Sequence, residues 1–173
     1  ITTGSVPEVS SKKIVAQERK LNKTLTENGR VLVDEKGVQV LLKAAEIAPD
    51  VPIVIIGDGP DLVSLQEHTR SAGLDHVQFL GPKWGEDLND WLRKARFVVV
   101  PSLWHENFPY VIFQAFAAGK PVLGSNKGGI PEMVVDGARG WIYEATDHIA
   151  LARNLLHAAE LPDAEIKKMG DDA

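Results

Sequence analysis

The sequence contains no cysteine, and this absence sets the first limits on what the chain can do. It excludes disulfides and cysteine-ligated metal sites. The sequence also has no apolar run of membrane-spanning length and no signal-peptide pattern, so we expect a cytoplasmic protein without a transmembrane segment. The chain begins with Ile1 rather than methionine, and we therefore expect it to be a piece of a longer protein.

An excess of positive charge is missing as well. The 19 Lys and Arg residues are outnumbered by 24 Asp and Glu residues, which gives a net charge of −5. The chain thus has no basic footprint for nucleic acid. An anionic substrate would have to be bound by local cations and helix N-termini rather than by the overall field. A hydrophobic content of 44% and a length of 173 residues are ordinary for a globular domain with one core.

Apolar runs alternate with amphipathic segments along most of the chain. The runs are typical of strands that are buried on both faces of a parallel sheet, and they cover 51–56, 76–80, 96–100, 121–123 and 139–143. The segments with apolar residues at helical spacing cover 37–48, 60–73, 86–95, 109–118 and 146–158. This alternation predicts an α/β fold, a doubly wound, Rossmann-like parallel sheet with helices on both faces.

The two ends of the chain lack this alternation. Residues 1–22 are polar, and we expect a linker or N-terminal extension there, followed by the ligand-binding domain at 23–173. The first strand of that domain can lie on either side of Gly29, because polar residues precede the glycine and an apolar run follows at 31–33. From Pro162 onward the sequence is charged, and we expect a frayed end.

The stretch 101–132 carries the most specific pattern. A buried strand ends before it, and a loop with one acid, Glu106, leads to a helix that Pro109 can open as the first residue. Gly119 fits the position just past the end of this helix, and a second strand then leads to a loop with Gly128–Gly129. Open α/β sheets bind anions where a helix N-terminus meets the carboxyl end of a parallel strand. The sequence therefore predicts a phosphate-bearing ligand at this point.

The same stretch resembles a pattern of the retaining glycosyltransferases of the GT-B fold, the family called glycosyl transferases group 1. That pattern is P-S-x-x-x-E-x-F-x-x-x-x-x-E-A-x-A-x-G-x-P-V, followed by G-G-x-x-E. The chain departs from it at Gln114, where the family has the second glutamate of its E-x7-E pair, and Pro109 replaces a frequent glycine. The matching residues are Pro101, Ser102, Glu106, Phe108, Ala115, Ala117, Gly119, Pro121, Val122, Gly128, Gly129 and Glu132.

The resemblance implies that the chain is the C-terminal, donor-binding half of a GT-B fold. Its substrate would be a nucleotide diphosphate sugar, from which a hexose passes to an acceptor with retention, and no cofactor or metal is implied. The N-terminal domain, which carries the acceptor site, lies outside this sequence. We therefore expect the isolated chain to bind donor but to transfer little or no sugar, and any peripheral membrane contact would come from the missing domain. Base, sugar and acceptor stay open.

Three catalytic residues are implied by the same resemblance. Arg30 and Lys36, in the family's G-R…K-G pattern, would stabilise the negative charge that builds on the diphosphate leaving group. Glu106 would accept hydrogen bonds from the hydroxyls of the transferred sugar. Judged by residue type alone, two surface cations and a solvated or helix-capping loop acid are the competing interpretations.

Further contacts to the donor are implied along the loops and the central helix. Backbone N–H groups at 108–111 would face the sugar and diphosphate, although Pro109 has none to offer. Gln114 would hold the ribose through its carbonyl, and the loop 81–84 resembles the family's loop near the base. The implied donor-binding residues are Gly29, Gly57, Lys83, Phe108, Pro109, Tyr110, Val111, Gln114, Gly128 and Gly129.

Two other hypotheses compete with an active transferase. A degenerate or regulatory nucleotide-binding module is favoured by Gln114, by Pro109 and by the polar stretch before Gly29. A nicotinamide-dependent oxidoreductase would also use a Rossmann-like sheet, but its G-x-G-x-x-G fingerprint fails here because Leu62 stands at the third glycine. The sequence also has no D-x-D motif of the kind that metal-dependent transferases use.

Overall fold

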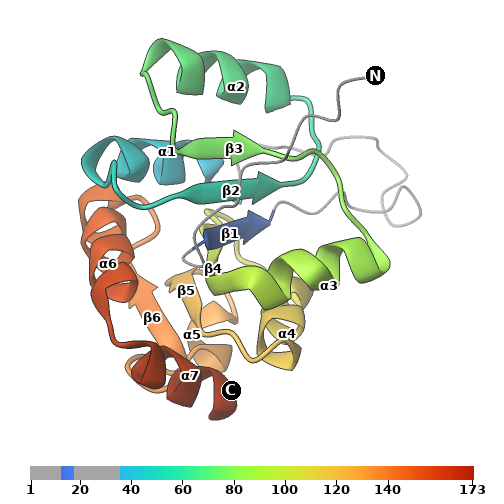
Figure 1. The fold of residues 1–173 in the computed structure, drawn as a ribbon, viewed down its shortest axis with the longest axis vertical. Helices are drawn as coiled ribbons and strands as arrows, with labels where there is room; N and C mark the ends of the chain where they lie inside the picture. The colour runs from blue at the N-terminus through green and yellow to red at the C-terminus, as the bar shows by residue number, and fades with distance from the viewer. Residues whose placement is uncertain (1–12, 18–35) are drawn as a thin grey trace, which may run out of the picture.

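One parallel sheet organises the computed structural model, which describes residues 13–17 and 36–173 (Figure 1). The order across the sheet is β3-β2-β1-β4-β5-β6, and each neighbouring pair is parallel. Along the chain, β2 and β3 extend the sheet from β1 to one edge, and β4, β5 and β6 then extend it from β1 to the other edge. The strands are β1 (Lys13–Gln17), β2 (Ile53–Ile56), β3 (Val77–Phe79), β4 (Ala95–Val100), β5 (Val122–Ser125) and β6 (Gly140–Tyr143).

Helices cover both faces of this sheet, which confirms the predicted doubly wound α/β fold. Helices α1, α2 and α6 pack on one face, and α3, α4 and α5 pack on the other. None of the helices in the described part of the chain is long and apolar enough to cross a membrane. The helices are α1 (Val38–Ile47), α2 (Leu62–Ser71), α3 (Gly85–Lys94), α4 (Tyr110–Ala117), α5 (Ile130–Met133), α6 (His148–Glu160) and α7 (Asp163–Asp171).

The core explains why the strands have continuous rather than alternating apolar sequences. Successive side chains of a strand point to opposite faces, and here both faces are covered. Ile53 and Ile55 of β2 therefore pack toward α1 and α6, whereas Val54 and Ile56 pack toward α3 and α4. Every residue of β4 is buried as well, so this strand is covered on both faces of the sheet.

Strand β1 lies inside the range 1–22, for which we expected a linker. That expectation is wrong for Lys13–Gln17, which pairs with β2 on one side and with β4 on the other. Its apolar run is only three residues long and is flanked by polar ones, so the sequence pattern hardly differs from that of a polar tail. Pairing on both sides, rather than strand propensity, explains its place in the sheet. The segment in which we expected the first strand, 23–33, lies outside the described residues.

The expected frayed end after Pro162 is also wrong, because residues 163–171 form α7. Ile166 and Met169 are buried in the core, and their spacing of three is the helical stripe that the many charges conceal. A single arginine, Arg96 at the start of β4, anchors this region. Its Nε donates to the carbonyl of Ala158 at 3.0 Å, and its guanidinium also binds the carbonyl of Leu161 and the carboxylate of Asp163.

Candidate functional site

Lys36 and Glu106 meet at the carboxyl ends of the two central strands. Lys36 directly precedes Gly37, the N-cap of α1, on the connection that follows β1, and Glu106 lies in the loop between β4 and α4. Nζ of Lys36 forms an ion pair with Oε1 of Glu106, and the two side chains are 20% and 22% exposed. Because β1 and β4 are neighbours whose connections run to opposite sides, this is the switch point at which open α/β sheets bind ligands.

Gly37 brings the lysine close to the end of β4. Its φ is +71°, and a Cβ atom at this position would overlap the carbonyl oxygen of Pro101. Only glycine combines this left-handed conformation with such a close backbone approach. The first turn of α1 is therefore pressed against the start of the loop that carries Glu106, and this proximity holds the Lys36–Glu106 pair together.

Two serines support the loop that carries Glu106. The hydroxyl of Ser102 donates to Oε1 of Glu106 at 3.3 Å, and the hydroxyl of Ser125 donates to the carbonyl of Ser102 at 2.6 Å. Both contacts of the Glu106 carboxylate therefore involve Oε1, and among the described residues Oε2 has no hydrogen-bond partner. Ser102 is part of the matched motif, but the motif assigns it no role, and the sequence analysis does not identify Ser125. The sequence feature that could have identified Ser125 is a hydroxyl at the end of an otherwise apolar strand.

The glycine pair 128–129 packs against the backbone of the same loop. Gly128 has a φ of +54°, whereas Gly129 has a φ of −80°, and a Cβ atom on Gly128 would overlap the carbonyl oxygen of Glu106. The N–H of Gly129 donates to that carbonyl at 2.8 Å, and a Cβ on Gly129 would overlap the carbonyl oxygen of Asn107. The structure thus gives both glycines a role in holding Glu106. Their contact with a donor stays a prediction.

Helix α4 begins directly after this loop, one residue later than we expected. Pro109 is its N-cap rather than its first helical residue, and the carbonyl of Pro109 accepts the first hydrogen bond, from the N–H of Ile112 at 3.0 Å. The first turn carries no acidic side chain that would oppose an anion at this helix N-terminus. Val111 is buried against the sheet, and Gln114 is half-buried one turn further along. The helix therefore presents its positive end at the same edge as Lys36.

The loops after β2 and β3 are tied to each other at this edge of the sheet. The N–H of Gly57 donates to the carbonyl of Gly81 at 3.1 Å, so Gly57 has a structural role whether or not it touches a ligand. Lys83 is half-buried on the second loop. Tyr110, another predicted donor-binding residue, is the exposed first residue of α4. The predicted site residues Gly29 and Arg30 lie outside the described part of the chain.

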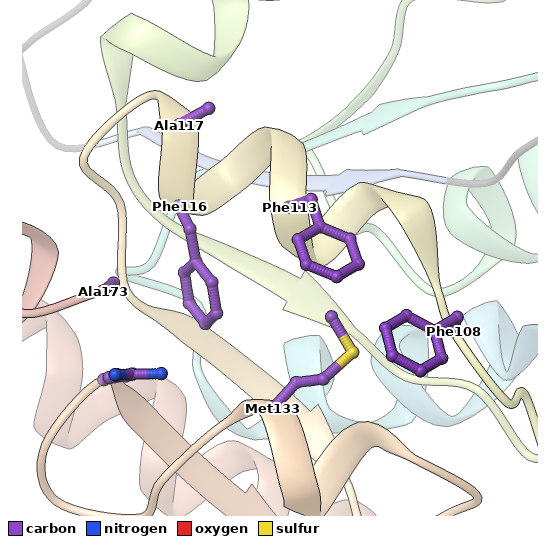
Figure 2. A pocket seen from close by; sticks show the side chains of 7 residues that line it. Phe108, Phe113, Phe116, Ala117, Met133 and Ala173 are labelled. Carbon is purple, nitrogen blue, oxygen red and sulfur yellow. The ribbon is translucent and has the colours of Figure 1, made fainter.

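A groove of about 530 Å³ runs along α4 and α5 (Figure 2). The rings of Phe108 and Phe113 stack along it with centroids 5.7 Å apart, and Phe116 and Met133 complete an apolar lining. Its one cation, Arg139, donates through Nε to the carbonyl of Asp172. A diphosphate needs several donors, so this groove suits it poorly. The Phe108 side chain lies in this apolar groove against Phe113, and the predicted contact of its backbone with a donor stays a prediction.

Comparison with known sequences places these features in a family. A family model described as glycosyl transferases group 1 matches residues 11–172. Among curated proteins, the D-inositol 3-phosphate glycosyltransferase of Streptomyces scabiei is 37% identical over 142 residues, which cover 74% of this chain and 32% of that protein. The chain spans about a third of the length of the first curated relatives it matches.

Solved structures with the same fold include both longer chains and an isolated C-terminal domain. HepE of Anabaena in complex with UDP-glucose matches with a TM-score of 0.77 and 23% identity, over 93% of this chain and 42% of that one. The C-terminal domain of a glycosyl transferase group 1 family protein from Francisella tularensis matches with a TM-score of 0.71 and 24% identity, over 93% of this chain and 81% of that one. These matches confirm that the fold is one half of a GT-B fold.

Proposed function

The chain belongs to the glycosyl transferases group 1 family, and from this premise we propose that it is the domain that binds the nucleotide diphosphate sugar donor. One observation carries the proposal. The Lys36–Glu106 pair lies at the carboxyl ends of β1 and β4, whose connections run to opposite sides, beside the N-terminus of α4. A sugar diphosphate has an anionic diphosphate and a sugar that carries hydroxyls. The pair brings a cation that suits the diphosphate next to a carboxylate that suits the sugar hydroxyls.

In this proposal the diphosphate is bound by Lys36, by the N-terminus of α4 and by Arg30, without a bound metal ion. The lysine supplies a point charge, the helix supplies N–H groups and its dipole, and the arginine supplies a bidentate grip. These groups would stabilise the negative charge that grows on the leaving diphosphate as the bond to the sugar breaks.

Glu106 takes the sugar side of the donor. Lys36 and Ser102 both contact its Oε1, which leaves Oε2 to accept hydrogen bonds from the hydroxyls of a hexose. The carboxylate charge also favours the positive charge that develops at the anomeric carbon. We propose transfer with retention of configuration, and the support for this is the resemblance of the 101–132 motif to retaining enzymes.

The proposed donor is a uridine diphosphate hexose. The support is that HepE, a fold neighbour, was solved in complex with UDP-glucose. The half-buried Gln114 would accept a hydrogen bond from the ribose, and the joined loops at Gly57 and Lys83 would face the base. Because the chain covers about a third of its curated relatives, we propose that the acceptor domain lies elsewhere in a longer protein and that this part alone transfers little sugar.

Calorimetric titration of the chain with UDP, GDP, ADP and their common sugar conjugates tests the proposal, with NAD as a negative control. We expect one nucleotide class to bind and Lys36→Ala to weaken that binding about tenfold or more, because a charge-assisted contact is lost. Lys167→Ala is the matched control, since Lys167 is an exposed lysine on α7 that pairs with Asp171. Absence of any nucleotide binding, or equal losses in the two variants, would contradict the proposal.

Gln114 favours a second candidate, a regulatory module that binds a nucleotide without catalysis. Such a module has no need to hold the sugar, so it would bind UDP and UDP-glucose equally well. A donor domain would bind the conjugate more tightly than UDP, because Glu106 adds contacts to the sugar. The ratio of the two dissociation constants therefore separates the candidates, and Gln114→Glu shows whether the lost charge limits ribose binding.

A further inference from the structure

Ser125 is a fully buried polar side chain at the carboxyl end of β5. Its exposed fraction is 0%, and its hydroxyl donates to the carbonyl oxygen of Ser102 at 2.6 Å. Strand β5 is otherwise apolar or glycine at this depth, with Val122 and Leu123 also fully buried. A hydroxyl in such a place is expected to have a hydrogen-bond partner, and here the partner belongs to the loop that carries Glu106.

The contact with Ser102 acts directly on the orientation of Glu106. The hydroxyl of Ser102 lies 3.3 Å from Oε1 of Glu106 and 3.3 Å from the carbonyl oxygen of Trp104, so its one proton is shared between these two acceptors. The same hydroxyl accepts from the N–H of Trp104 at 3.3 Å. Ser125 thus holds the backbone of Ser102 in place. The side chain of Ser102 in turn contacts the Glu106 carboxylate and the backbone of Trp104. A second tie comes from the same segment of chain, where the N–H of Gly129 holds the carbonyl of Glu106 at 2.8 Å.

We propose that Ser125 is a positioning residue that orients Glu106 toward the sugar of the donor, a role that rests on the proposed donor-binding function. The ion pair with Lys36 cannot do this alone, because the diphosphate competes with Glu106 for the same ammonium group. Once Lys36 turns to the phosphate, the carboxylate keeps its place only through Ser102, Ser125 and the glycine loop. A carboxylate that is held in place before binding loses less conformational entropy when the sugar arrives.

This role predicts an effect on the sugar rather than on the nucleotide. Ser125 lies behind the Glu106 loop and is fully buried, so it has no surface with which to contact a ligand itself. Loss of its hydroxyl would loosen Glu106 while leaving Lys36 and the N-terminus of α4 in place. The quantity to follow is the ratio of the dissociation constant for UDP to that for UDP-glucose, which measures the contribution of the sugar to binding.

The test is calorimetric titration of UDP and UDP-glucose with Ser125→Ala, Ser125→Thr and a matched control, Thr69→Val. Thr69 is also buried and its hydroxyl also donates to a backbone carbonyl, that of Leu65 at 2.8 Å, but it lies on α2. We expect Ser125→Ala to lower the ratio about three- to tenfold, the range for loss of one buried hydrogen bond, with the Kd for UDP little changed. Ser125→Thr keeps the hydroxyl and the ratio, and Thr69→Val leaves the ratio unchanged.

Amide hydrogen exchange gives a second readout that needs no ligand. Ser125→Ala should speed exchange at the N–H of Gly129, which donates to Glu106, and leave the amides of α2 unchanged. An unchanged ratio in Ser125→Ala, in a chain where Glu106→Gln lowers it, would overturn the positioning role alone. A wild-type chain that binds no nucleotide, or a ratio that Glu106→Gln does not alter, would overturn the proposed function and the role of Ser125 with it.

Discussion

The two ends of the sheet each hold a cation, but the two cations differ in exposure and in the number of their partners. At the amino end, Arg96 has a side chain that is 5% exposed and holds two backbone carbonyls and one carboxylate. At the carboxyl end, the side chain of Lys36 is 20% exposed and pairs with one carboxylate. Arginine at the amino end is committed to the fold, because each of its three guanidinium nitrogens binds an acceptor of the protein itself. Lysine at the carboxyl end is a point charge that can exchange one anionic partner for another.

The comparison shows how one domain separates stability from ligand binding. Helix α7 packs at the amino end, where Gly170 lies so close to Gly119 that a Cβ atom would overlap the carbonyl of Gly119. The carboxyl end has its own close backbone contacts, at Gly37 and at Gly128, but these hold side chains in position rather than bury them. Substitutions at the two ends should therefore affect different measurable properties.

Removal of the amino-end anchor should have the largest effect. Arg96→Ala leaves the carbonyls of Ala158 and Leu161 without their donor, and we expect the free energy of unfolding to fall by about 3 kcal/mol. Urea denaturation measures this loss, and the nucleotide affinity of the folded fraction should stay the same. Asp163→Asn is the control, because its carboxylate is 87% exposed and should contribute less than about 1 kcal/mol. Equal losses in the two variants would contradict the assignment of the anchor to Arg96.

Disruption of the carboxyl end should cost slightly less stability but should affect binding. Gly37→Ala imposes a left-handed conformation on alanine and a clash with Pro101, so we expect a loss of about 2 kcal/mol and weaker UDP binding as Lys36 moves. Gly73→Ala is the matched control, since its φ is +67° but nothing lies within 4 Å of its Cβ position. It should cost about 1 kcal/mol and leave affinity unchanged. Similar affinities in both variants would argue against the role of Gly37.

A buried polar group without a partner offers a sharper contrast with Arg96. Tyr143 ends β6, is 3% exposed, and its hydroxyl has no hydrogen-bond partner among the described residues. Burial raises the pKa of Tyr143 above its ordinary value of 10.0, so the folded state keeps the proton that the unfolded chain loses. Stability that is present below pH 10 is therefore lost as the pH rises above it.

Tyr143→Phe removes this dependence on pH. Between pH 9 and pH 11 we expect the wild-type chain to lose about 1.4 kcal/mol more stability than the variant, which is one pH unit of proton linkage above the unfolded pKa. At pH 8 the variant should be as stable as the wild type or about 1 kcal/mol more stable, because the unpaired hydroxyl is gone. Parallel stability curves for the two proteins would show that the hydroxyl is not buried as described.

The smallest predicted effect concerns the ion pair itself. Glu106→Gln releases Lys36 from its charged partner, so UDP alone should bind about two- to threefold more tightly, in line with the modest strength of a partly exposed pair. UDP-glucose should gain less than UDP does, since its sugar loses the carboxylate. Titration of both ligands measures the difference between the two changes in affinity. Weaker binding of UDP to this variant would show that the carboxylate supports Lys36 instead of competing for it.

The sequence predicts the fold well where burial is continuous. The apolar runs of β2 and of β4 after Arg96 are unambiguous, because both faces of the sheet are covered and no polar residue interrupts 53–56 or 97–100. Strand β1 was missed because three apolar residues between polar neighbours are too few to stand out. Helix α7 was missed because an exposed charged face conceals the Ile166–Met169 stripe. In both cases tertiary contacts, rather than local preference, determine the structure.

The site could be predicted only in part, and for a different reason. Lys36 and Glu106 were named from their resemblance to family positions, but no spacing in the sequence shows that they touch. Their contact depends on β1 and β4 being neighbours, which is a property of strand order. The sequence does not identify Ser125, because its role depends on the backbone carbonyl of Ser102 in another loop. Every residue has a backbone carbonyl, so a sequence pattern cannot show which one a side chain binds.

The strand order also has a consequence for how the chain comes to be folded. Strand β1 is the first of the described strands in the sequence, yet it occupies the middle of the sheet between β2 and β4. During synthesis β1 would leave the ribosome before β2, which begins at Ile53, and well before β4, which begins at Ala95. Such long-range pairing slows folding. Any truncation that treats the first 17 residues as a dispensable tail would remove β1, the strand that pairs with both β2 and β4.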